Sequence, residues 1–435
     1  MSRRPKRATQ HKTAERQTAE RQTVDRQTVD RPLADRRRAA EAFVAKLGRA
    51  LHRYGSPAHR LEEAMLSLSA RLGLTGQFFS TPTAMFASFG DGTAQRTVLL
   101  RVEPGDVDLE KLSRLDAVLT RVLHGSLTPR RASEQVDVIV AAPTRYGPVL
   151  STLAFALASA SAARFFGGGL SEIAATFAIG LGIGLLALLV GGRPNAGRLF
   201  EPLAALGAAL GAVLWSAAVQ PVAYEQVVLG ALIVLIPGLT LTVSLAELAS
   251  RHLVSGSARL AGAAIVFLTI GFGVALGQRL AHALLGALPA VEPTALPAWT
   301  EGAALVIAAV AFTVLFRARP QDAGWILLAS CLALGGARLG TALLGPQIGA
   351  FLGAVLVGVG SNLFARLRNR PSAIPQMPGL ILLVPGSIGF RGMASLLDQD
   401  TLTGVQAAFT MSLVAIALVT GLLVANVLMP PRRAL

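Results

Sequence analysis

Residues 232–238 read LIVLIPG, and residues 380–386 read LILLVPG, an offset of 148 positions. Each stretch is an apolar run that ends in Pro-Gly. Proline removes a backbone N–H and glycine weakens a helix further, so a helix formed by either run is expected to break there. A second pair, GAALGAVL at 207–214 and GAFLGAVL at 349–356, precedes the first pair in both places at an offset of 142. The two pairs, in the same order and at nearly the same offset, indicate an internal repeat.

Apolar runs of about 20 residues, the length that crosses a bilayer as a helix, surround these motifs. We predict ten spans, near 147–166, 171–190, 202–219, 226–246, 260–278, 300–316, 323–343, 347–365, 379–397 and 404–428. The repeat aligns the third span with the eighth and the fourth with the ninth. The expected fold is therefore a polytopic α-helical membrane protein with two five-helix repeats, 147–298 and 299–435. Because five is odd, the repeats are expected to be inverted, as in many secondary transporters.

Charge is concentrated before the first span. The chain is 52% hydrophobic, and residues 1–146 hold 25 of its 40 Lys and Arg residues. In the loops that follow, eleven arginines fall on the side of the N-terminus and four on the other side. This asymmetry follows the positive-inside rule for an even number of spans. We expect a multi-pass protein of the inner (plasma) membrane with both termini in the cytoplasm.

The N-terminal region divides into two parts. Residues 1–38 are basic and contain a period-five repeat (AERQT, VDRQT), which predicts a disordered tail. Such a tail favours contact with anionic lipid over nucleic acid. Residues 39–146 are expected to form a small cytoplasmic α/β domain.

Within that domain, Phe43, Val44, Leu47 and Leu51 have helical spacing. Ser56 is expected to be the N-cap of a second helix, with Pro57 at its first position. Strands are predicted at 78–90 and 97–103, and helices near 107–124 and 129–139.

The Pro-Gly breaks are the best candidates for a substrate site. A broken helix exposes N–H and C=O groups that suit the two charged ends of an amino acid. Thr and Ser side chains follow each break, although they could also bond only to their own helix. The candidate binding residues are Pro237, Gly238, Thr240, Ser244, Pro385, Gly386 and Ser387.

Charged residues near span ends are the candidates for proton or charge coupling. A charge inside a bilayer is costly, so it marks a functional hypothesis unless the side chain reaches water at the span end. The candidates are Glu247, Glu172, Glu201 and Arg391, and Glu247 ranks first because it follows the Pro-Gly break.

Several classes of chemistry lack their sequence signatures. The single cysteine, Cys331, excludes a disulfide framework and cysteine-based metal clusters. The chain has no Walker A loop, no HExxH and no GxSxG. We therefore expect no cofactor, no metal site and no enzymatic activity.

The sequence resembles the threonine/serine exporter family. The N-terminal half of that family is matched by LGRALHRYGSPAHRLEEAM (47–65), FFSTPTAMFASF (78–89), FFGGGLSEIAATFAIG (165–180) and LIPGLTLTVSLAELAS (235–250). Residues 337–392 resemble its C-terminal half, which is a separate chain in some relatives. The resemblance implies ten spans, a cytoplasmic N-terminal domain, and export of threonine and serine driven by the proton motive force. The family's YG-x-P-A-x-R-x-E pattern falls on Tyr54, Gly55, Pro57, Ala58, Arg60 and Glu62, while Glu172 stands where Asp is more usual.

Two other functions stay open. The same scaffold could export another metabolite, such as a dicarboxylate, for which more arginines near the cavity would be expected. Alternatively, Ser56, His59 and Glu63 could form a membrane-tethered hydrolase, although their spacing on one helix does not suggest a triad. The expected partners are an amino acid, protons and the lipid bilayer. The oligomeric state is left open, with a homo-oligomer among the alternatives.

Overall fold

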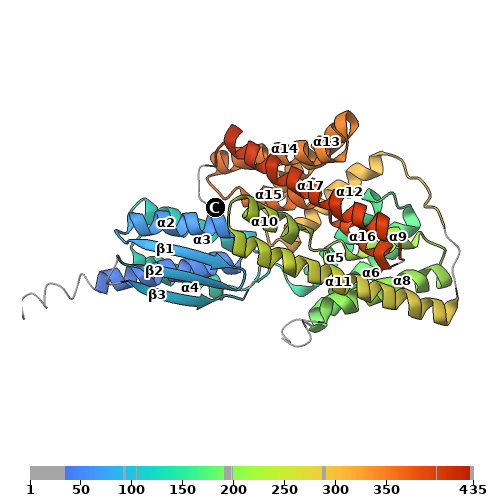
Figure 1. The fold of residues 1–435 in the computed structure, drawn as a ribbon, viewed down its shortest axis with the longest axis horizontal. Helices are drawn as coiled ribbons and strands as arrows, with labels where there is room; N and C mark the ends of the chain where they lie inside the picture. Colours follow the sequence, from blue (N-terminus) through green and yellow to red (C-terminus); the bar gives the residue numbers. More distant parts are fainter. Residues whose placement is uncertain are drawn as a thin grey trace, which may run out of the picture.

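A computed structural model of the chain describes residues 35–91, 95–103, 105–190, 197, 199–286, 291–397 and 399–431. Residues 1–34 of the tail that we predict to be disordered lie outside these residues. Residues 35–38 are helical, so the prediction of disorder is wrong for them. An α/β domain stands at one end of the molecule and a helical bundle forms the rest (Figure 1). We call the end of the bundle that meets the α/β domain the domain end, and the opposite end the distal end. The bundle begins with its first helix at the domain end, and the described chain also ends there.

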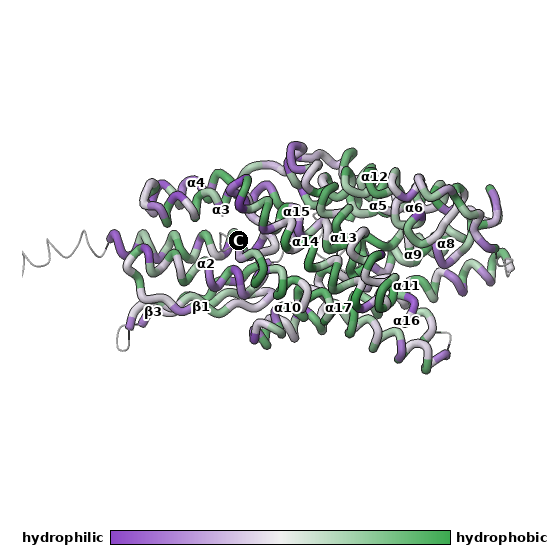
Figure 2. Tube along the Cα trace, turned by 90° about the horizontal axis from the view of Figure 1, so that it is seen from above, coloured by the Kyte–Doolittle hydropathy of each residue, from purple (hydrophilic) through white to green (hydrophobic). Residues whose placement is uncertain are grey.

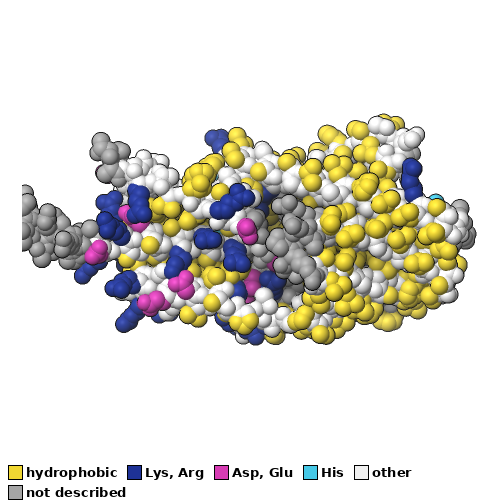
Figure 3. Space-filling view, turned by 90° about the horizontal axis from the view of Figure 1, so that it is seen from below, with side chains coloured by type: hydrophobic (Ala, Val, Ile, Leu, Met, Phe, Trp, Pro, Cys, Tyr) yellow, Lys and Arg dark blue, Asp and Glu magenta, His cyan; other side chains and the backbone are white. Residues whose placement is uncertain are grey.

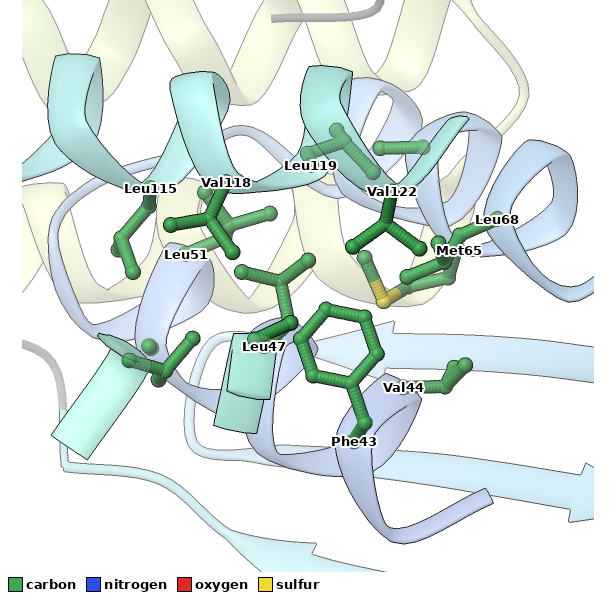
Figure 4. Packing of buried hydrophobic residues seen from close by; sticks show 14 of the residues in the cluster. Phe43, Val44, Leu47, Leu51, Met65, Leu68, Leu115, Val118, Leu119 and Val122 are labelled. Atoms are coloured by element: carbon green, nitrogen blue, oxygen red, sulfur yellow. The ribbon is translucent and has the colours of Figure 1, made fainter. Parts of the chain in front are cut away.

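The α/β domain has a three-stranded antiparallel sheet in the order β1 (Gly76–Thr81), β2 (Ala84–Phe89) and β3 (Arg96–Arg101). A helix over 35–53 and α2 (Ala58–Arg71) lie between this sheet and the pair α3 (Leu109–Leu123) and α4 (Pro129–Ala141) (Figure 2). The core joins all the layers. Phe43, Leu47, Met65 and Val122 meet inside it (Figure 4).

Two local predictions in this domain are wrong. Residues 78–90 are not one strand, because the chain turns at 82–83 and β1 and β2 form a hairpin. Pro82 supplies no N–H for a sheet, which explains the turn. Ser56 is not the N-cap of α2. The cap residue is Pro57, which makes no side-chain cap bond, and the Ser56 hydroxyl is buried without a hydrogen-bond partner among the described residues.

The bundle consists almost entirely of apolar helices. Their bounds are α5 (Pro148–Phe165), α6 (Leu170–Val190), α8 (Phe200–Ala218), α9 (Tyr224–Leu232), α10 (Gly238–Ala249), α11 (Leu253–Leu285), α12 (Trp299–Leu315), η2 (Pro320–Asp322), α13 (Ala323–Leu344), α14 (Pro346–Arg368), α15 (Ala373–Ile381), α16 (Gly386–Leu397) and α17 (Thr401–Leu428). In the described part of the chain, eight helical segments are long and apolar enough to cross a membrane, and two apolar helices are shorter.

The outer surface of the bundle is apolar as well. Figure 3 shows hydrophobic side chains covering its face, while the Lys, Arg, Asp and Glu side chains gather over the α/β domain. Large side chains such as Leu189, Phe272 and Val427 are exposed there, at 67%, 64% and 80%. A surface this apolar suits lipid and not water. The chain is therefore a polytopic membrane protein, as predicted.

Both Pro-Gly motifs interrupt helices. The predicted span at 226–246 is two helices, α9 and α10, separated by residues 233–237. The predicted span at 379–397 is α15 and α16, separated by residues 382–385, and α15 begins six residues earlier than expected. Proline at the end of each break explains why the helix does not continue.

Helix packing has matching pairs in the two halves of the bundle. α8 packs against α11 and α14 packs against α17, while α10 packs against α11 and α16 packs against α17. Contacts between the halves match too, since α10 lies against α17 and α11 against α16. The helices that carry the repeated GAxLGAVL motif, α8 and α14, occupy corresponding positions in this pattern.

Candidate functional site: a central cavity at two broken helices

A large cavity lies inside the bundle, where the two broken helices meet. Its volume is about 800 Å³, which is in the range of small-molecule sites. Residues 233–237 of the first break line it, as do residues 382 and 384 of the second break and Ile381 just before it. Helices α5, α8, α11, α12 and α13 complete the wall, and Asp106 and Arg317 border it at the domain end.

Residues at the helix ends beside both breaks line this cavity. The carbonyl groups of Val234 and Ile381, which line it, accept no hydrogen bond from any described residue. On the other side of the breaks, the N–H groups of Thr240 and Ser387 are likewise without an acceptor among the described residues. Helix N-termini carry partial positive charge and C-termini partial negative charge. One cavity thus offers dipole ends of both signs.

The two Pro-Gly motifs touch each other beside the cavity. A Cβ atom placed on Gly238 would lie 3.6 Å from the Gly386 Cα and would collide with Val384. A Cβ on Gly386 would lie 2.5 Å from Ile236 Cγ2. Only glycine, which has no side chain, allows these two segments of the backbone to approach this closely. The paired motifs predicted from the sequence are therefore neighbours in space.

The seven candidate binding residues occupy three places. Pro237, Thr240 and Ser387 line the cavity. The two glycines form the crossing, and Pro385 is buried beside it. Ser244 lies elsewhere: its hydroxyl is fully buried and donates to the Leu241 carbonyl at 2.7 Å. It therefore bonds to its own helix, which was one of the two roles considered for it.

Among the four charged candidates, Glu201 borders the cavity. It lies in the first turn of α8 and is half-buried. It makes no hydrogen bond or ion pair with a described residue.

Glu247 lies away from the cavity, at the domain end of α10, and its side chain is completely buried. Its Oε1 accepts the backbone N–H of Ala58, the first residue of α2, at 2.9 Å. Its Oε2 accepts from the Ser255 hydroxyl at 2.7 Å, and the Arg259 Nε lies 3.1 Å away. Glu247 thus caps a helix of the α/β domain, and the guanidinium of Arg259 balances the charge of its carboxylate.

The other two charged candidates are also separate from the cavity. The Glu172 carboxylate accepts the N–H groups of Gly169 and Ala223, at 2.8 and 3.0 Å, and joins the start of α6 to the segment before α9. Arg391 is about half exposed and pairs with Glu225 at 2.7 Å.

Sequence reasoning missed the aromatic residues of the cavity. Its wall contains six phenylalanines: Phe155, Phe165, Phe166, Phe200, Phe312 and Phe316. Phenylalanine is equally suited to lipid-facing and helix-packing positions, so no pattern in the sequence distinguished them. Phe155 of α5 and Phe312 of α12 could be assigned to the interior of the bundle only once the packing of α5 against α12 was known.

The residues considered for a hydrolase do not form a nucleophile–base pair. His59 and Glu63 line a second cavity, described below, whereas Ser56 does not. No hydrogen bond joins Ser56 to His59 among the described contacts. Within the described residues, no group of three or more His, Cys, Asp or Glu side chains is placed to hold a metal ion.

Comparison with known families covers almost the whole bundle and domain. Residues 42–281 match the family model described as "Putative threonine/serine exporter", and residues 301–428 match the one described as "Threonine/Serine exporter, ThrE". The two matches correspond to the two halves recognised in the sequence.

Curated relatives are similar over most of this chain. Proteins named "Pheromone-regulated membrane protein 10" are 28% identical in Pichia sorbitophila, over 85% of this chain and 37% of the relative, and 29% identical in Saccharomyces cerevisiae, over 85% of this chain and 48% of the relative. This chain spans less than half the length of these relatives. No solved structure matches it.

Proposed function

Because the chain belongs to the threonine/serine exporter family, we propose that it is a secondary transporter that exports threonine and serine from the cytoplasm. One observation carries the proposal: two broken helices line one cavity of about 800 Å³ with residues whose backbone N–H or C=O groups have no partner among the described residues. An amino acid has a carboxylate for the helix N-termini and an ammonium group for the C-termini. Thr240 and Ser387 add hydroxyls that could bind a hydroxylated side chain.

We propose that the bundle has ten spans arranged as two inverted five-helix repeats. The fourth and ninth spans would be the broken pairs α9–α10 and α15–α16, and the sixth would be the shorter helix α12. The matching helix pairs of the two halves support this arrangement. The return of the chain to the domain end supports an even number of spans with both termini on one side, the cytoplasmic one in our proposal.

We also propose that transport uses the proton motive force, with Glu201 as the proton-carrying group. Among the four charged candidates, Glu201 borders the cavity, whereas Glu247 and Glu172 satisfy backbone N–H groups and Arg391 pairs with Glu225. Export of a dicarboxylate finds less support. Arg317 borders the cavity, but Asp106 already neutralises it at 2.8 Å.

The test is efflux from cells that lack their native exporters and are preloaded with threonine- or serine-containing dipeptides. We expect efflux of either amino acid that a protonophore reduces. Pro237→Ala should remove most of this efflux, because the helix can then continue through the break. In a separate variant, Glu201→Gln, any efflux that remains should be insensitive to the protonophore. Glu225→Gln, which changes an exposed carboxylate, is the matched control. Efflux equal to that of empty cells would refute the substrate assignment.

A further inference from the structure

A second cavity lies between the α/β domain and the domain end of the bundle. Its volume is about 560 Å³. One wall is a face of α2 and a face of α3, and the other includes Asn369, just after α14, and Asn426, near the end of α17. We call it the junction pocket. It shares no lining residue with the central cavity.

The junction pocket holds charges of both signs on adjacent turns of α2. Arg60 and Glu63 both line it, and neither makes an ion pair or a hydrogen bond with a described side chain. The two groups are close enough to influence each other, since Glu63 opposes the effect of burial, which lowers the pKa of Arg60. Asp116 also lines the pocket but already has an interaction.

Several other polar groups of the pocket carry no charge. Thr120 contributes a hydroxyl, and Asn369 and Asn426 contribute amides from the bundle side. Burial lowers the pKa of His59 to about 4, so its ring is uncharged at neutral pH. The His59 Nδ1 atom is buried and has no hydrogen-bond partner among the described residues. Unsatisfied buried polar atoms are uncommon in folded proteins, so this atom points to a missing partner.

These groups match one chemical class. An anion alone would meet the repulsion of Glu63, and a cation alone that of Arg60. A molecule with a carboxylate and an ammonium group a few bonds apart satisfies both, with charge-assisted hydrogen bonds at each end. Its side chain would then face the hydroxyl and amides, and the volume suits a small molecule.

We propose that the junction pocket binds a free α-amino acid, with its carboxylate on Arg60 and its ammonium group on Glu63. The inference goes beyond transport, because the pocket is outside the central cavity. A ligand there would contact α2, α3 and the ends of α14 and α17 together. It would make the fit of the α/β domain on the bundle depend on the amino acid concentration.

The test is equilibrium binding of radiolabelled L-threonine and L-serine to the purified full-length protein in lipid nanodiscs, followed by competition with the other common amino acids. Arg60→Gln and Glu63→Gln should each weaken one class of sites at least tenfold. Matched controls are Arg101→Gln and Glu134→Gln, which change exposed charges of the same domain. Butyrate and propylamine, each with one of the two charged groups, should compete at least tenfold less well than the amino acid. Glu63 is exposed, so Glu63→Gln should fold even if Arg60→Gln does not.

The outcomes separate this proposal from the transport proposal. Loss of one class of sites in both variants supports the junction pocket, even if the protein exports neither threonine nor serine. Efflux of threonine together with binding that neither variant changes would overturn the junction pocket and leave transport standing. Equal competition by butyrate, or no binding of any amino acid outside the central cavity, would also overturn it.

Discussion

At the scale of single residues, Glu247 shows how a conspicuous charge can have a structural role. It follows a Pro-Gly break in the sequence, and this made it the leading candidate for coupling. In the structure, its carboxylate is enclosed by Ala58 N–H, Ser255 and Arg259. A buried carboxylate with this many donors contributes to docking of the α/β domain.

Replacing Glu247 with Ala should destabilise the protein strongly. The change leaves the Arg259 guanidinium and the Ala58 N–H without their acceptor, and loss of one partner of a buried pair costs about 3–5 kcal/mol. We expect a clear fall in Tm of the detergent-solubilised protein. Glu225→Ala, which removes an exposed pair with Arg391, should change stability by less than about 1 kcal/mol. Equal shifts for the two variants would contradict the assigned role.

His59 should make stability depend on pH. Burial lowers its pKa to about 4, and the positive charges of Arg60 and His252 act in the same direction. An unfolded histidine has a pKa near 6.5, so the unfolded chain binds more protons between pH 6.5 and about 4. Stability should therefore fall as the pH falls through this window.

Measurements of Tm at pH 7.5, 5.5 and 4.5 can check this dependence. His59→Gln should flatten the fall relative to the unchanged protein, because glutamine does not titrate. His124→Gln, which changes the exposed histidine at the C-cap of α3, serves as the control. A fall as steep in His59→Gln as in the unchanged protein would show that other groups cause it.

At the scale of elements, the crossing of the two broken helices determines the shape of the central cavity. Each break removes a stretch of helix at mid-bundle, and the glycines bring the breaks into contact. Backbone groups without helical partners can persist inside a membrane protein only where they meet protein, water or a ligand. The cavity provides such a place.

Gly238→Val should abolish transport by separating the two breaks. The new side chain would collide with Val384 beside Gly386. The two backbone segments that form the breaks would therefore have to move apart. Gly262→Val in α11, where a new Cβ would meet nothing within 4 Å, should leave transport nearly unchanged. The measurement is efflux at matched membrane levels of the two proteins. Full efflux by the Gly238 variant would show that the contact is not needed.

The sequence predicted features that depend on neighbouring residues. The Pro-Gly breaks, the apolar spans and the helix that carries Phe43 and Leu47 all follow from local chemistry. The sequence did not reveal the partner of Glu247, because Ala58 is 189 residues away in the chain. Ser56 was expected to cap α2 because it is the residue of capping type nearest the helix start. Nothing in the sequence near α2 indicates that the carboxylate of Glu247 binds there instead. The strand predicted at 78–90 ignored the effect of Pro82 on sheet bonding.

At the scale of the whole molecule, the α/β domain is docked on the bundle through the start of two helices. Glu247 of α10 binds the first N–H of α2. The N–H groups of Leu109 and Glu110, which begin α3, donate to the carbonyls of Phe316 and Arg317, at 3.0 and 3.2 Å. The domain also borders the central cavity through Asp106. It is therefore placed at one entrance of the proposed transport path.

Linking the domain to the bundle should block transport. In a Cys331→Ser background, Asp106→Cys and Arg317→Cys place two thiols where the ion pair now lies. A short bis-methanethiosulfonate reagent should join them and reduce efflux, and a reductant should restore it. Either single-cysteine variant treated alike is the control. Undiminished efflux after complete linking would mean that this entrance need not open.

These two docking points suggest how movement of the α/β domain during transport could be measured. The amide of Ala58 is bonded to α10, whereas the amides of Leu109 and Glu110 are bonded to the two residues that follow α12. If those helices shift relative to each other, a stiff domain can follow only one of them. The amide whose hydrogen bond to the bundle is broken by this movement would then exchange its proton with solvent faster. Deuterium uptake at these positions, with and without substrate, would identify which bundle helix carries the domain during each cycle.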